Sequence, residues 1–114
     1  MPYERIFGLE VADQETYTHY RKEMVPLMEA AGGTFRYDFD VARVLRGEHD
    51  VQINRAFVIR FPNQDASEKF FADPRYLEIR RRLFEPSVAS IVLIAEYDTS
   101  LVVPSGNESR PDAR

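Results

Sequence analysis

The chain has 114 residues, the size of one ordinary domain, and its 44% apolar content is enough for one core. Fifteen basic and nineteen acidic residues give a formal net charge of −4, which disfavours nucleic acid as a partner. The lack of cysteine, together with only two histidines, excludes disulfides, thiolate metal sites and an all-histidine metal site. We therefore expect neither a metal nor a cofactor.

The start of the chain includes an acidic residue and lacks the basic segment and apolar stretch of a secretory signal. No apolar run approaches the roughly 20 residues that a membrane-spanning helix needs. These features predict a cytoplasmic protein without a membrane partner.

The first predicted strand covers residues 5–11, where apolar side chains alternate with period two. A helix follows over residues 13–31, because apolar residues recur there at intervals of three and four, and Asp13 is suited to cap its first turn. Pro26 lies inside this pattern, so we expect the helix to kink near Lys22 or to restart at the proline. Two glycines then end the helix.

Period-two alternation returns over residues 34–46 and predicts a long second strand with Phe35, Tyr37 and Phe39 on one face. Only the polar turn 47–50 precedes the next apolar segment, which favours an antiparallel hairpin.

The third predicted strand covers residues 55–61, and Asp65 is the predicted cap of the helix that follows it. Asp73 before a proline predicts a second cap and a restarted helix. The apolar run 91–95 predicts a last strand that is covered on both faces rather than lying at an edge.

The resulting order, β-α-β-β-α-β, predicts an α+β ferredoxin-like fold with two helices on one face of a four-stranded antiparallel sheet. We expect a single domain over residues 1–98 and a polar C-terminal tail over residues 99–114, in which residues 101–103 could pair with a sheet edge.

Two helices cover only one side of such a sheet, yet the last two strands carry large apolar residues on both sides. Large exposed apolar patches are rare on monomers, so we expect a homodimer in which two sheets face each other. The alternative is a monomer whose tail folds over the sheet.

Several short segments, in this order and at this spacing, carry a family resemblance: Tyr17–Tyr20, Pro26, Gly32–Phe35, Val44–Gly47, Ile59–Pro62 and Asp73–Tyr76. With them, the span from Val11 to Ala95 resembles the bacterial family called domain of unknown function 1330, in the dimeric α+β barrel superfamily. The resemblance implies a ferredoxin-like fold, a homodimer and no established activity. Superfamily relatives include cofactor-free monooxygenases, lactone isomerases and haem-using enzymes, so the fold alone specifies no chemistry.

Candidate catalytic residues are His19, Asp38 and Asp40. Asp38 and Asp40 share one face of a strand, about 7 Å apart, where they could bind a hard cation or act as acid and base. Alternatively they lie on a solvated edge and pair with Arg36 and Arg55. His19 could act as a general base near neutral pH, or could simply lie on the helix surface.

Candidate ligand-binding residues are Tyr20, Tyr37, Arg60 and Glu96. Tyrosines can line a pocket for a flat apolar molecule, although tyrosines at helical spacing more often belong to a core. Arg60 and Glu96 could meet in the dimer cleft, either for a ligand or to fix the interface. The basic run 80–82 is explained in part by a solvated helix face.

Two functions from different classes follow, beside a purely structural dimer. The first is a homodimeric α+β barrel protein of uncharacterised function whose cleft accepts a small organic molecule. The second is a cofactor-independent enzyme of monooxygenase or isomerase type, acting on a small aromatic or lactone-like substrate. A partly apolar cavity that touches at least two of His19, Tyr37, Asp38, Arg60 and Glu96 would favour the enzyme.

Overall fold

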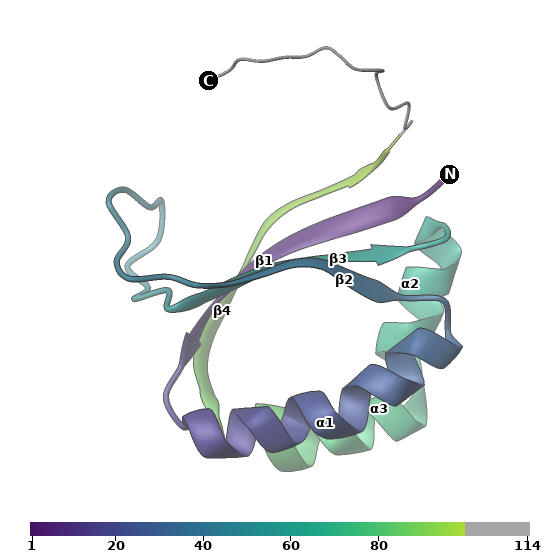
Figure 1. The fold of residues 1–114 in the computed structure, drawn as a ribbon, viewed down its shortest axis with the longest axis horizontal. Coiled ribbons are helices and arrows are strands. Elements are labelled where there is room, and N and C mark those ends of the chain that lie inside the picture. Colours follow the sequence, from purple (N-terminus) through teal and green to yellow (C-terminus); the bar gives the residue numbers. More distant parts are fainter. Residues whose placement is uncertain (100–114) are drawn as a thin grey trace.

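The computed structural model describes residues 1–99 and confirms the ferredoxin-like α+β fold. The sheet is antiparallel with strand order β2-β3-β1-β4, and all helices lie on one of its faces (Figure 1). In chain order the elements are β1 (Tyr3–Val11), α1 (Gln14–Ala30), β2 (Thr34–Asp40), β3 (Arg55–Phe61), α2 (Gln64–Ala72), α3 (Pro74–Ile79), the π-helical turn η1 (Arg80–Phe84) and β4 (Val88–Asp98).

Most of the predicted tail, including the segment 101–103, lies outside the described residues. Within residues 1–99, no helix has the length and apolar character needed to cross a membrane.

The first helix begins where the sequence predicts and does not restart at its proline. The Asp13 carboxylate accepts a hydrogen bond from the backbone N–H of Thr16 at 3.1 Å, as expected for an N-cap. Helix α1 continues through Pro26, since Met24 and Met28 on either side of it are both buried in the core. The helix ends at Ala30, and Gly32 just beyond its cap has a positive φ of 88°, which suits a glycine.

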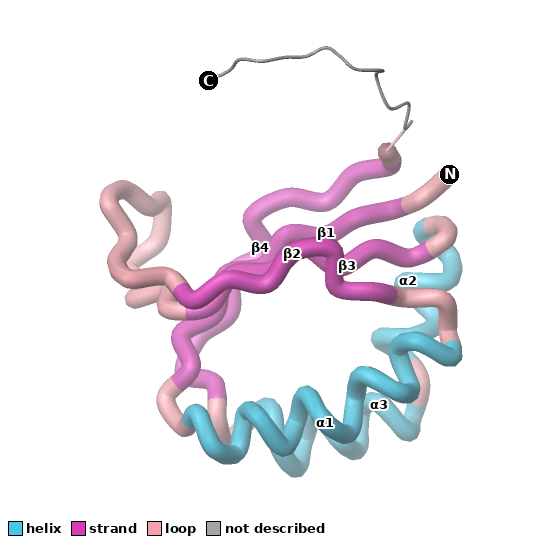
Figure 2. Tube along the Cα trace, viewed as in Figure 1, coloured by secondary structure: helices cyan, strands magenta, loops and turns pink. Residues whose placement is uncertain are grey.

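The second strand is shorter than predicted. It ends at Asp40 rather than at residue 46, because β3 begins at Arg55 and offers no partner beyond that pair. The hairpin is antiparallel as expected, but its connection is the long loop 41–54 and not a four-residue turn. This loop stands on the side of the sheet opposite the helices (Figure 2).

A register shift in β2 corrects the predicted facing of its aromatic residues. Phe35 pairs with Ile59, whereas Tyr37 pairs with Val58, so the two aromatic side chains do not share a face. Phe35 packs against the core on the helix-facing side of the sheet. Tyr37 and Phe39 lie on the other side, where they are 50% and 54% exposed. We call that helix-free side of the sheet the open face.

Two further predictions are wrong. The last strand is an edge strand in this sheet, and Ile91, Leu93 and Ile94 on it are 42%, 43% and 54% exposed. The cap of α2 is Asn63, whose side chain accepts from the N–H of Ala66 at 2.8 Å, and not Asp65. Asp73 caps α3 as predicted.

The core fills the space between the helices and the sheet. Its sheet-side residues include Leu9, Ile59 and Phe61, which keep at most 1% of their surface exposed. The helix side contributes chiefly aromatic and methionine side chains: Tyr17, Tyr20, Met24, Met28, Phe70, Tyr76 and Phe84.

Candidate functional site

The core is not completely filled, and a pocket of about 170 Å³ remains between the sheet and the helices. We call it the inter-layer pocket. No acidic residue lines it. Its walls consist of eight aromatic residues (Phe7, Tyr17, Tyr20, Phe35, Phe57, Phe71, Tyr76, Phe84), three aliphatic ones (Met24, Ile59, Ile91) and three arginines (Arg5, Arg21, Arg80).

Two tyrosine residues of the wall, Tyr20 and Tyr76, have buried hydroxyls that are paired with each other. The Tyr20 and Tyr76 oxygens lie 2.8 Å apart, and both residues are at least 96% buried. Burial, followed by the neighbouring Tyr76 hydroxyl, raises the pKa of Tyr20 well above its usual value. The Tyr20 hydroxyl therefore stays protonated at neutral pH and can donate a hydrogen bond, but it does not serve as a base.

Arg5 comes from the helix-facing side of β1 and is held between aromatic rings. Its guanidinium carbon lies 5.2 Å from the centre of the Phe71 ring. The Nε of Arg5 is buried and has no hydrogen-bond partner. A carboxylate oxygen of Glu96 lies 3.3 Å from this nitrogen, but Glu96 accepts its hydrogen bond from the hydroxyl of Tyr3.

Arg80 reaches the pocket from η1. Its guanidinium carbon lies 4.8 Å from the centre of the Phe84 ring, and no described residue forms an ion pair with it. Ile91 on the edge strand β4 is 42% exposed although it lines the pocket. The pocket therefore opens toward solvent at the β4 edge.

Asp38, a candidate from the sequence, is part of an ion network outside the pocket wall. Its carboxylate accepts two hydrogen bonds from Arg21, at 3.0 and 3.1 Å, and two from Arg55, both at 2.9 Å. Burial works against the charged form, but the bonds from Arg55 and Arg21 outweigh it and lower the pKa of Asp38 to about 2. A carboxylate held in this way is a poor proton acceptor at neutral pH.

The other two catalytic candidates lie elsewhere on the surface. Asp40 is exposed at the end of β2, opposite Arg55 in the strand register. His19 is exposed on α1, and neither residue lines the inter-layer pocket.

The sequence-based pairing of Arg60 with Glu96 does not occur in the subunit. Arg60 lies on the open face, where its Nε donates to the Glu4 carboxylate at 2.9 Å, whereas Glu96 is paired with Arg5 on the helix-facing side. Glu4 also accepts from Arg36 and from the hydroxyl of Tyr97, each at 3.0 Å.

Glu4 is a buried acid that sequence reasoning missed, with only 3% of its surface exposed. Burial would raise the pKa of Glu4, but the hydrogen bonds from Tyr97, Arg36 and Arg60 lower it overall. The register that brings these side chains together joins residues 32 to 93 positions apart, so no local pattern reveals it.

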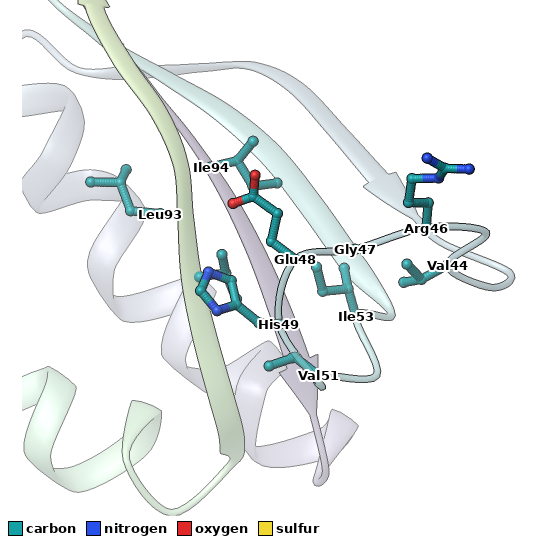
Figure 3. A pocket seen from close by; sticks show the side chains of 10 residues that line it. Val44, Arg46, Gly47, Glu48, His49, Val51, Ile53, Leu93 and Ile94 are labelled. Atoms are coloured by element: carbon teal, nitrogen blue, oxygen red, sulfur yellow. The ribbon is translucent and has the colours of Figure 1, made fainter.

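A second, wider pocket of about 570 Å³ lies between the loop 41–54 and strand β4 (Figure 3). We call it the loop pocket. Val92 and Ile94 of the edge strand contribute apolar side chains to its lining. Glu48 and His49 extend toward that strand from the loop. Neither pocket touches two of the five residues His19, Tyr37, Asp38, Arg60 and Glu96.

Of the two, the inter-layer pocket is the better candidate for a ligand. Its walls are formed by core residues of the sheet and the packed helices, whereas the loop pocket lies between a loop and exposed apolar residues of an edge strand. Such a surface is more typical of a contact with another polypeptide than of a small-molecule site.

The fold and the pocket define an α+β protein of the ferredoxin-like class. The chain belongs to the family described as Domain of unknown function (DUF1330), whose model matches residues 5–97. No curated protein matches the chain in sequence.

Solved structures show the same fold at low sequence identity. A protein of unknown function from Rhodopseudomonas palustris is 19% identical, with a TM-score of 0.73, covering 90% of this chain and 84% of the other. A dimeric ferredoxin-like protein of unknown function from Jannaschia sp. CCS1 is 10% identical, with a TM-score of 0.61 and coverages of 87% and 100%. A hydroxynitrile lyase from Passiflora edulis is 17% identical, with a TM-score of 0.61 and coverages of 90% and 97%.

Proposed function

We propose that the protein is a homodimer whose subunits each bind a small organic molecule in the inter-layer pocket. The observation that carries the binding proposal is an unfilled pocket inside the core, in whose wall aromatic residues are the majority. Its volume of about 170 Å³ is close to that of a core cavity of about 150 Å³ that can hold one benzene molecule. A ligand with one six-membered ring fits this size.

The open face supports the dimer. Tyr37 and Phe39 stack on it with their ring centres 5.9 Å apart, and each keeps about half of its surface exposed. A second open face offers the same surface by two-fold symmetry, and burying both would remove these rings from water. The dimeric ferredoxin-like neighbour from Jannaschia is in line with this arrangement.

An enzyme is the second candidate: a cofactor-independent catalyst of monooxygenase or isomerase type, acting on a small aromatic or lactone-like substrate. The neighbour from Passiflora is a lyase, and the Tyr20–Tyr76 pair could supply a proton donor. Binding is the better-supported function because the pocket is lined by no histidine, aspartate or glutamate that could take up a proton.

The test is a binding assay with one-ring compounds, for which we choose benzyl alcohol, benzamide and benzoate. Replacing Ile91 by Trp fills the mouth of the pocket, and the exposed position tolerates a larger side chain. We expect calorimetric titration to show binding of at least one compound to the natural protein and a loss of at least tenfold in affinity in I91W.

The matched control is Leu77→Trp, since Leu77 is similarly exposed, at 45%, but lies on α3 outside both pockets. Binding that is equal in I91W and L77W, or absent from the natural protein for all three compounds, would overturn the proposed site.

A further inference from the structure

The cationic groups of the inter-layer pocket point to the chemical class of its ligand, an inference that rests on the proposed binding function. Three arginines and no acid line the pocket. Their charges are not equally satisfied, and the difference between them carries the argument.

Arg21 is fully engaged. Two of its nitrogens donate to Asp38, and its Nε donates to the hydroxyl of Tyr17 at 2.8 Å. Its guanidinium also stacks on Phe35, with the ring centre 4.0 Å away. It therefore has little left to offer a ligand and belongs to the structure of the wall.

Arg5 and Arg80 differ from Arg21 in this respect. Arg5 forms an ion pair with the 42% exposed Glu96, whose Oε1 lies 3.3 Å from its Nε, but that oxygen accepts from Tyr3 and the buried Nε makes no hydrogen bond. Arg80 forms no ion pair within residues 1–99 and rests on Phe84 alone. Buried donors without acceptors are uncommon in folded proteins.

We propose that the inter-layer pocket binds a monocyclic organic carboxylate, with the ring against the aromatic wall and the carboxylate held by Arg5 and Arg80. A guanidinium presents a planar pair of N–H donors that matches the two oxygens of a carboxylate. The ligand carboxylate supplies a hydrogen-bond acceptor for the guanidinium of Arg5, whose Nε makes no hydrogen bond in the structure, and its negative charge balances Arg80.

The remaining polar groups are compatible with such a ligand. The Tyr20–Tyr76 hydroxyls are neutral and can donate to an oxygen of the bound molecule. An organic cation would face Arg5 and Arg80 with no carboxylate in the lining to compensate them. A neutral ring without a carboxylate would supply no negative charge to the guanidinium groups of Arg5 and Arg80.

The test compares benzoate with its neutral counterpart benzamide by calorimetric titration at pH 7. We expect benzoate to bind about tenfold or more tightly, in keeping with the strength of charge-assisted hydrogen bonds. Replacing Arg80 by Gln should weaken benzoate about tenfold and leave benzamide unchanged. The control is Arg81→Gln, because Arg81 is exposed on the same turn and pairs with Glu78 outside the pocket.

Arg5 is closer to the core, so R5Q could disturb folding, and R5K provides a second variant that keeps the charge. We expect R5K to retain folding, judged by its thermal transition, and to weaken benzoate more than benzamide because lysine lacks the planar pair of donors. Equal affinity for benzoate and benzamide, or equal losses in R80Q and R81Q, would overturn the carboxylate proposal and leave the binding site standing. No binding of either compound would overturn the carboxylate proposal, and if benzyl alcohol also failed to bind, the proposed site would be overturned as well.

Discussion

The hydroxyl oxygens of Tyr20 and Tyr76 lie 2.8 Å apart, although the two residues are 56 positions apart in the chain. Tyr20 belongs to α1 and Tyr76 to α3, so this bond joins the two helices beside the inter-layer pocket. Their rings also meet edge to face, with centres 6.4 Å apart. The pair thus fixes the spacing of the pocket's helical wall.

Removing one hydroxyl of this pair should cost more stability than removing both. The Tyr76→Phe variant leaves the buried Tyr20 hydroxyl without a partner, which costs about 1–3 kcal/mol. The Y20F/Y76F double variant leaves no unpaired group, so we expect it to be closer to the natural protein than either single variant. Urea unfolding of all four proteins measures this cycle, and additive losses would contradict it.

Gly8 on β1 should not accept a β-branched side chain. The Cδ1 of Ile53 lies 2.7 Å from the position that a Cβ at Gly8 would occupy, so the loop 41–54 rests directly on this glycine. We expect Gly8→Val to destabilise the protein by roughly 1–3 kcal/mol through overpacking. The measurement is urea unfolding, in which Ile53→Ala should recover part of the loss if this contact is its cause. If Ile53→Ala leaves the loss of stability unchanged, overpacking against Ile53 is not its cause.

The Asp38 network predicts a stability change in acid. The pKa of Asp38 is lowered to about 2, so its ion pairs stabilise the folded state fully above about pH 4, the ordinary range for aspartate. This contribution should be lost as the pH falls through 2. In D38N that part of the acid dependence should be missing, as measured by thermal unfolding between pH 2 and 6.

The control for this series is Asp40→Asn, since Asp40 is exposed on the same strand and forms no ion pair among the described residues. D40N should keep the acid dependence of the natural protein. If D38N and D40N give the same profile, the Arg21–Asp38–Arg55 network does not stabilise the fold.

The homodimer predicts that a charge on the open face separates the subunits. Phe39→Glu places a carboxylate among the apolar side chains that the second copy would cover. We expect sedimentation velocity at micromolar concentration to show a dimer for the natural protein and a monomer for F39E. Leu77→Glu, at an exposed apolar position on the helix side, should remain a dimer. If F39E remains a dimer, the subunit interface does not involve the open face around Phe39.

Local features of the sequence predicted much of the fold. The alternation around Leu9 and the caps at Asp13 and Asp73 depend on neighbouring residues, and all three are found where expected. The register shift near Arg36 has no such signal, because no glycine or proline marks it. The shift places Tyr37 on the open face instead of on the same side as Phe35. It therefore changes which residues form the open face.

The candidate site was predicted less well, because it depends on contacts between distant residues. The sequence predicts a binding role for Tyr20, but its hydrogen-bond partner Tyr76 depends on the packing of α3 against α1, which no local pattern indicates. Arg5 did carry a signal, since it shares the period-two phase of Phe7 and Leu9 and is therefore a charged residue on the core side of its strand. A charged residue on the core side needs a compensating group, and Glu96 supplies one as an ion pair at 3.3 Å, although the buried Nε of Arg5 makes no hydrogen bond.

The most direct test of the central claim locates the ligand by NMR of side-chain methyl groups. The two pockets carry different methyl residues, so a titration with benzoate or benzamide distinguishes them without any substitution. We predict that the resonances of the inter-layer residues Met24, Ile59 and Ile91 shift with ligand concentration while those of Val44, Val51 and Ile53 around the loop pocket do not. Shifts confined to the loop-pocket methyl groups, or no shifts at all, would contradict the account.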